Sequence, residues 1–189
     1  MAIRLATVQD VPRILEIYGP YVENTVNSFE YTVPSLEEFT QRFLDITTQF
    51  PWVVWEENGR VMGYAYGSRP FKRAAYQWSA EASIYLCPES WGKGIGKKLY
   101  AALEQILQAQ GYRKVYAIIT TANEGSVAFH QAVGYRYITT MPDCGHKFGK
   151  WYGTVWMDKD LNIWDMPPCE PIPIHRLKDP LKDIDSSAI

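Results

Sequence analysis

Between a predicted strand and a predicted amphipathic helix stands the segment Trp91-Gly92-Lys93-Gly94-Ile95-Gly96-Lys97-Lys98. Glycine tolerates backbone angles that other residues avoid, so such a segment lets main-chain N–H groups converge on a ligand. The N-terminus of the following helix adds a partial positive charge. Together these features favour a site for phosphate groups. The alternative is a tight strand-to-helix turn that binds nothing.

Two common nucleotide-binding loops do not fit this segment. A P-loop needs a glycine five residues before its Gly-Lys pair and Ser or Thr after it, but Trp91 and Lys98 occupy these positions. The Gly-x-Gly-x-x-Gly fingerprint of dinucleotide-binding folds would require glycine at Lys97 or Leu99. That fingerprint also belongs to the first strand-helix turn of its fold, whereas this segment lies in the middle of the chain.

Hydrophobic periodicity and turn residues predict the elements around this segment. They are a strand at 3–6, helices at about 10–22 and from Ser35, a hairpin around Asn58-Gly59, a strand at 77–86, a helix ending at Gly111, a strand at 115–119, a helix at 123–133, and strands at 135–140 and 151–157. The strand at 115–119 has no polar alternation, which predicts cover on both faces. This order predicts an α/β fold with helices over a mixed sheet.

The length of 189 residues predicts one domain. We expect it to span residues 1–161. A Pro-rich arm follows at 162–189, which is expected to be extended, either disordered or packed on a partner subunit.

Composition argues against several functional classes. With Lys+Arg 19 against Asp+Glu 21, the net charge of -2 does not favour a nucleic-acid partner. Three widely spaced cysteines and three histidines without ligand spacing predict neither a disulfide framework nor a metal site. The chain starts without a signal-like segment, and no apolar run approaches the ~18 residues of a membrane span. We therefore expect a cytoplasmic protein without a membrane partner.

The glycine segment resembles the Gln/Arg-x-x-Gly-x-Gly/Ala loop of the GCN5-related N-acetyltransferase (GNAT) superfamily, with Trp91 in place of Gln or Arg. In that family, main-chain amides of the loop hold the pyrophosphate of acetyl-CoA. The pattern Asn123-x-x-Ser126-x-x-x-His130-x-x-x-Gly134-Tyr135 resembles the family's next motif. The order of elements agrees over roughly residues 3–161.

A closer resemblance is to the phosphinothricin and methionine sulfone/sulfoximine acetyltransferase branch. It is carried by the segment from Arg73-Ala74-Ala75-Tyr76 through Glu81 to Leu86, by Phe29-Glu30 with Pro34-Ser35, by His130, and by Gly145-His146-Lys147-Phe148-Gly149-Lys150-Trp151. It implies a GNAT fold with a mixed, mostly antiparallel central sheet, acetyl-CoA as co-substrate without a metal, and a homodimer. The implied reaction acetylates the α-amino group of a small amino acid or analogue.

The resemblance also suggests which residues form the site. Residues expected to bind acetyl-CoA are Ile84, Tyr85, Leu86, Gly92, Lys93, Gly94, Ile95, Gly96, Lys97, Asn123 and Ser126. Residues expected to bind the acceptor are Phe29, Glu30, Lys72, Arg73, Tyr76 and Trp78. Arginine suits the carboxylate of an amino acid because its guanidinium donates two parallel hydrogen bonds. Each aromatic residue has plain core packing as its alternative.

Two residues are candidates for the chemistry. Glu81 is a lone carboxylate in an otherwise uncharged strand, so partial burial would raise its pKa and suit it as a general base. Its alternative is a solvent-facing residue paired with Lys or Arg. His130 is expected to protonate the leaving thiolate or to orient the substrate. Its alternative is a surface or satisfied core histidine.

Two other functions remain open from the sequence. The first is an acetyl-CoA sensor that has lost its chemistry, which Trp91 at the usual Gln/Arg position would favour. The second keeps the reaction but uses a protein or peptide N-terminus as the acceptor.

Overall fold

The computed structural model describes residues 2–163 and 169–182. Within them, seven strands form one sheet in the order β1-β2-β3-β4-β5-β7-β6. The strands are β1 (Ala2–Leu5), β2 (Trp52–Glu57), β3 (Arg60–Ser68), β4 (Ser79–Leu86), β5 (Lys114–Thr120), β6 (Arg136–Lys147) and β7 (Lys150–Asp160). Only β4 and β5 are parallel; the other neighbouring pairs are antiparallel. The predicted α/β fold with a mixed, mostly antiparallel sheet is confirmed.

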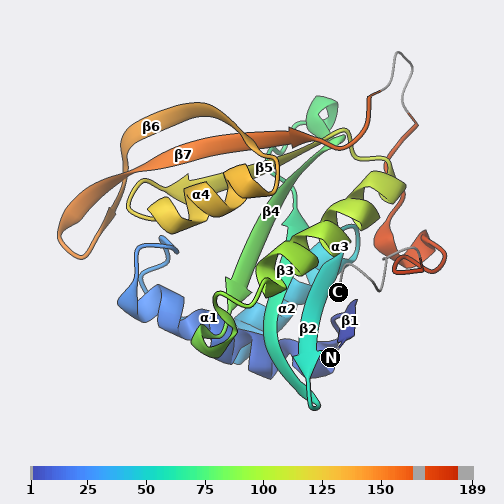
Figure 1. Cartoon of the computed structure of the whole chain (residues 1–189), viewed down its shortest axis with the longest axis horizontal. Helices are drawn as coiled ribbons and strands as arrows, with labels where there is room; N and C mark the ends of the chain where they lie inside the picture. Colours follow the sequence, from blue (N-terminus) through green and yellow to red (C-terminus); the bar gives the residue numbers. More distant parts are fainter. Residues whose placement is uncertain (1, 164–168, 183–189) are drawn as a thin grey trace.

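Helices cover both faces of this sheet (Figure 1). They are α1 (Val11–Asn24), α2 (Leu36–Thr47), α3 (Ile95–Gln110) and α4 (Glu124–Ala132). In the view of Figure 1, α3 and α4 lie in front of the sheet, and α1 and α2 lie behind it. Strand β2 shows the two layers, because Val53 and Trp55 join the core beneath α3, whereas Trp52 and Val54 join the core beneath α1 and α2.

Local sequence signals set several of these boundaries. Ser35 and Glu38 form a reciprocal capping box at the start of α2, each side chain accepting from the other's backbone N–H. Asn58 and Gly59 have φ angles of 51° and 76°, as a tight two-residue hairpin turn requires. Gly111 ends α3 with φ 92°. These three predictions are confirmed.

Strand β5 is not covered equally on its two faces, which corrects the expectation for 115–119. Val115, Ala117 and Ile119 are buried in the α3 core, but Tyr116 and Ile118 are only half-buried. The reason is that the second core, beneath α1 and α2, draws its strand residues from β2 and β3 and does not extend to β5. An apolar run without alternation therefore borders a partly open face.

The closing strands are longer than the sequence predicted, and β6 forms an edge of the sheet. Nearly all of β6 is exposed. It also contains Pro142, where its register with β7 shifts between Met141 and Gly145. Proline is tolerated there because an edge strand can lack one ladder donor.

Part of the C-terminal arm packs on its own domain. The Gln110 side chain donates to the Ile172 carbonyl at 2.7 Å, and the Ile172 N–H donates to the Gln110 carbonyl at 2.7 Å. Ile174 is buried in the α3 core. Residues 164–168 and 183–189 lie outside the described residues, and packing of the arm on a partner subunit stays a prediction.

Candidate active site

A cleft opens where β4 and β5 part. The two strands pair at Ser79↔Lys114, Ala80↔Val115 and Glu81↔Tyr116, and the pairing ends there. Beyond this point, residues 82–85 of β4 and 117–120 of β5 line a cavity of about 100 Å³. Because strands that separate lose their ladder partners across the gap, main-chain groups on both sides become available to a ligand.

The glycine segment lies at the other end of the site. Gly92 and Gly94 have φ angles of 73° and 77°, and Gly94 is the N-cap of α3. In the first turn of α3, the main-chain N–H groups of Lys97 and Lys98 donate to the Gly94 carbonyl. The preceding N–H groups have no carbonyl to reach within the helix, so they remain available at its positive end.

A larger cavity of about 800 Å³ extends from this segment. Its lining includes Leu86, Trp91, Gly92, Gly94, Ile95, Gly96, Lys97 and Phe129. Gly96 permits close packing, since a Cβ there would lie 3.2 Å from the Phe129 ring. Trp91 is 59% exposed at this cavity, so its indole forms part of the surface that a ligand would meet.

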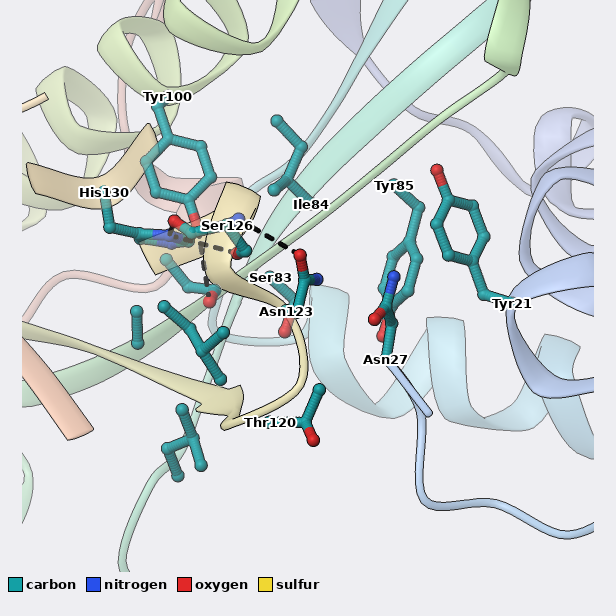
Figure 2. Close-up of a pocket in the computed structure, with 14 residues that line it drawn as sticks. Tyr21, Asn27, Ser83, Ile84, Tyr85, Tyr100, Thr120, Asn123, Ser126 and His130 are labelled. Carbon is teal, nitrogen blue, oxygen red and sulfur yellow. Dashed lines mark hydrogen bonds between the residues drawn. The ribbon is translucent and has the colours of Figure 1, made fainter. Parts of the chain in front are cut away.

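The two cavities share one wall and form a continuous site. Both are lined by Tyr21, Asn27, Ile84, Asn123 and Ser126. Figure 2 shows Tyr21, Asn27 and Tyr85 on one side of the smaller cavity and Asn123, Ser126 and His130 on the other. Asn123 also caps α4 by accepting from the Ser126 N–H at 3.1 Å. A long ligand can therefore reach from the glycine segment to the split between the strands.

Glu81 occupies the last paired position before the split. It faces the side of β4 opposite Ala80 and Ala82, and it is half-buried. Burial raises the pKa of the Glu81 carboxyl. Burial also raises the pKa of Tyr66 to about 12, and the nearby charge of Glu81 acts in the same direction. Within the described residues no ion pair involves Glu81, which argues against the solvent-facing, paired alternative.

His130 is held at both ring nitrogens. Its Nδ1 lies 2.7 Å from the Ser126 carbonyl oxygen, and its Nε2 lies 2.8 Å from the Tyr100 Oη. A carbonyl can only accept, so Nδ1 carries the proton and Nε2 accepts from the Tyr100 hydroxyl. Burial lowers the pKa of His130, so the ring is neutral near pH 7. Both His130 and Tyr100 line the smaller cavity.

The remaining candidates fall into two groups. All but one of the candidate acetyl-CoA-binding residues line a cavity, the exception being Lys93. They are Ile84, Tyr85, Leu86, Gly92, Gly94, Ile95, Gly96, Lys97, Asn123 and Ser126. The candidate acceptor residues line neither. Phe29 and Glu30 lie in the loop after α1, where Glu30 pairs with Arg42 at 2.7 Å. Lys72, Arg73, Tyr76 and Trp78 lie between β3 and β4, where the Trp78 indole donates to the Cys169 carbonyl. Their role with the acceptor stays a prediction.

Tyr21, Asn27 and Tyr100 are among the lining residues that sequence reasoning missed. Tyr21 and Tyr100 follow the apolar stripes of their helices, so each is indistinguishable from core packing in the sequence. Asn27 lies in a loop whose position depends on contacts more than 100 residues away. No local pattern marks any of them.

The described part of the chain shows two further absences. In residues 2–163 and 169–182, no cluster of three His, Cys, Asp or Glu side chains could hold a metal ion. In the same residues, no helix combines the length and apolar character needed to span a bilayer.

Comparison with known proteins identifies the family to which the chain belongs. Residues 3–156 match the family model described as the acetyltransferase (GNAT) domain. The chain belongs to the GNAT acetyltransferase family. As a GNAT enzyme it is an acetyl-CoA-dependent N-acetyltransferase, and a similar GNAT protein has been solved in complex with AcCoA.

Three relatives show how close the similarity is. Phosphinothricin N-acetyltransferase of Streptomyces viridochromogenes is 30% identical over 92% of each chain. The L-methionine sulfoximine/L-methionine sulfone acetyltransferase of Pseudomonas paraeruginosa is 34% identical over 85% of this chain and 95% of the relative. The crystal structure of a GNAT phosphinothricin acetyltransferase from Sinorhizobium meliloti in complex with AcCoA is 40% identical, with a TM-score of 0.85 over 90% of this chain and 94% of that one.

The burial of Glu81 leads to a prediction about stability. Because the pKa of Glu81 is raised in the folded protein, ionisation of this group costs stability as the pH rises above its ordinary value of 4.5. We expect Glu81→Gln to match the wild type in urea unfolding at pH 4 and to be more stable at pH 8. If the free energies of unfolding of the two proteins differ by the same amount at both pH values, burial of the charged carboxylate does not cause the difference in stability.

Proposed function

We propose that the enzyme transfers the acetyl group of acetyl-CoA to the α-amino group of a small amino acid or analogue, of the phosphinothricin, methionine sulfone or methionine sulfoximine type. The names of the relatives support this acceptor class. The observation that carries the proposal is the continuous site, which joins a helix N-terminus to the split between β4 and β5. The half-buried Glu81 is the last paired residue before that split.

Acetyl-CoA is proposed to bind along the larger cavity. The N–H groups of residues 92–97 would hold its diphosphate, since an anion is stabilised at a helix N-terminus. Asn123 and Ser126 would contact the pantetheine arm. Main-chain N–H groups of residues 84–86 would stabilise the oxyanion that forms from the thioester carbonyl, at about 2.7–4 kcal/mol per donor in other enzymes.

Glu81 is proposed as the general base. With its pKa raised by burial, the carboxylate accepts a proton from the acceptor ammonium, directly or through a water. The freed amine nitrogen attacks the thioester carbon, and the C–S bond breaks as the tetrahedral intermediate collapses. Of the two protons that leave the nitrogen, the first passes through Glu81 to solvent and the second ends on the CoA thiol.

His130 is proposed to act through Tyr100. The neutral ring accepts the single hydroxyl proton of Tyr100 and so fixes that hydroxyl at the cavity. As the sulfur departs, the hydroxyl is proposed to turn this proton from Nε2 toward the sulfur. His130 is then a positioning residue, whereas Tyr100 is the group that touches the reacting atoms.

We also propose that the enzyme works in the cytoplasm, where its cysteines would stay reduced. The cysteines in the described part of the chain form no disulfide.

The base assignment predicts a large kinetic effect. We expect Glu81→Gln to lower kcat by about 10²–10⁴-fold, because general-base assistance is lost, with little change in KM for acetyl-CoA. Thiol release from acetyl-CoA measures this, with methionine sulfone, methionine sulfoximine and phosphinothricin as acceptors. Glu37→Gln, at an exposed position in the first turn of α2, is the matched control.

Three outcomes would redirect the proposal, once CoA binding and a peptide acceptor are tested beside the thiol-release assay. Wild-type kcat in Glu81→Gln would remove Glu81 from the chemistry. CoA binding without turnover of any amine would favour the sensor. Turnover confined to a peptide with a free N-terminus would favour the peptide acceptor.

We further propose a homodimer formed through β6. This edge strand is long and exposed and carries Tyr137, Ile138 and Met141, each at least 45% exposed. Phe148 and Trp151 extend the apolar surface at the β6–β7 turn. An edge strand of this kind tends to pair with another chain, and a second copy is the partner always at hand.

The dimer proposal predicts the mass in solution. Sedimentation equilibrium should give twice the mass of one chain for the wild type. Ile138→Glu should shift the equilibrium toward the monomer, because it places a charge in the apolar contact. Leu44→Glu, at a similarly exposed residue of α2, should leave the mass unchanged. A monomeric wild type would contradict the proposal.

A further inference from the structure

The loop after α1, residues 25–31, contains neither helix nor strand, yet it is tied to several elements. The Ser28 hydroxyl lies 2.7 Å from the Tyr18 hydroxyl of α1. Glu30 pairs with Arg42 of α2 at 2.7 Å. From the other side, the Tyr31 hydroxyl donates to the His146 carbonyl of β6 at 2.7 Å. Figure 1 shows this loop rising from α1 toward the β6–β7 hairpin.

A buried lysine completes the attachment. Lys147, the last residue of β6, is 1% exposed, which is rare for lysine. Its Nζ donates to the Val22 carbonyl at 2.7 Å and to the Ser28 carbonyl at 2.7 Å. One ammonium group therefore joins the last turns of α1 to the loop. Two strong hydrogen bonds offset part of the cost of burying its charge, a cost that also lowers the pKa of Lys147.

Packing supports the same contact. Gly145 lies two residues before Lys147, and the Phe29 ring rests directly on it: a Cβ at this glycine would lie 2.4 Å from the ring. The end of β6 thus contacts the loop at two points: Gly145 packs against the Phe29 ring, and Lys147 donates to the Ser28 carbonyl. These contacts leave the loop little freedom between Ser28 and Tyr31.

Asn27 is the residue that this arrangement presents to the site. It lines both cavities, and Figure 2 shows it beside Tyr85 and Tyr21, across the cavity from Asn123. Its neighbour Ser28 is the residue that Lys147 holds. A shift of the Ser28 carbonyl would therefore move Asn27 relative to the cleft.

We propose that Lys147 is a positioning residue, which fixes the 25–31 loop so that the Asn27 side chain contacts the amino-acid acceptor beside the thioester. The amide of Asn27 can donate to a carboxylate and accept from an amine, so it suits an acceptor that carries both groups. The proposal rests on the proposed function for its substrate. The fixation of the loop stands on the contacts alone.

Steady-state kinetics test the role of Lys147 in the full-length enzyme. We expect Lys147→Met to raise KM for the acceptor by 10-fold or more, with KM for acetyl-CoA within twofold of wild type. Lys150→Met, in the same hairpin but exposed, should change neither. Equal increases in both KM values, or no increase, would overturn the proposal.

A double-mutant cycle tests whether Lys147 acts through Asn27. Asn27→Ala should also raise KM for the acceptor selectively. In the Asn27→Ala background, Lys147→Met should add less than threefold, because the contact it positions is already lost. If the increase in acceptor KM of the double variant equals the product of the two single increases, the two residues act independently, and the proposal is overturned.

Hydrogen exchange tests the loop without any turnover. Backbone amides of residues 25–31 should exchange at least 10-fold faster in Lys147→Met than in Lys150→Met, and unchanged exchange would overturn the proposal. If Lys147→Met does not fold, Lys147→Arg replaces it in both assays. It should give a smaller rise confined to the acceptor KM, and an equal rise for acetyl-CoA would contradict the proposal. Lack of wild-type turnover would refute the proposed function, while the exchange result would still decide the loop.

Discussion

Three main-chain pairings join β4 to β5, and the two strands part after Glu81. The rest of the site depends on this interruption, because a continuous ladder would leave no cavity between the strands and would pair their main-chain groups with each other. One face of β5 is also partly open, because the core beneath α1 and α2 takes its buried strand residues from β2 and β3.

Two charged groups of the protein are buried at a cost in stability. Glu81 is a half-buried carboxylate with a raised pKa, and Lys147 is a buried ammonium with a lowered one. Their environments differ in a way that fits their roles. Glu81 has no ion-pair partner among the described residues, which suits its proposed role as a base, whereas Lys147 is held by two carbonyls, which suits its proposed role in positioning a loop.

Much of the fold was predictable because local chemistry determines it. Asn58-Gly59, the Ser35 capping box and Gly111 each need only neighbours in sequence. The glycine segment was found for the same reason. Asn27 and Tyr100 could not be found, because their place at the site comes from tertiary contacts. Lys147 belongs to a strand that is otherwise almost entirely exposed, and lysine is ordinarily exposed itself, so nothing local in the sequence indicates its burial.

The most direct test of the whole account is a crystal structure of the enzyme with CoA and an amino-acid acceptor. We predict that the diphosphate lies on the N–H groups of residues 92–97, that the sulfur lies between β4 and β5 near Ile84, and that the acceptor nitrogen lies within one water of Glu81. A diphosphate bound elsewhere, or a Glu81 carboxylate turned away from the acceptor, would contradict the account.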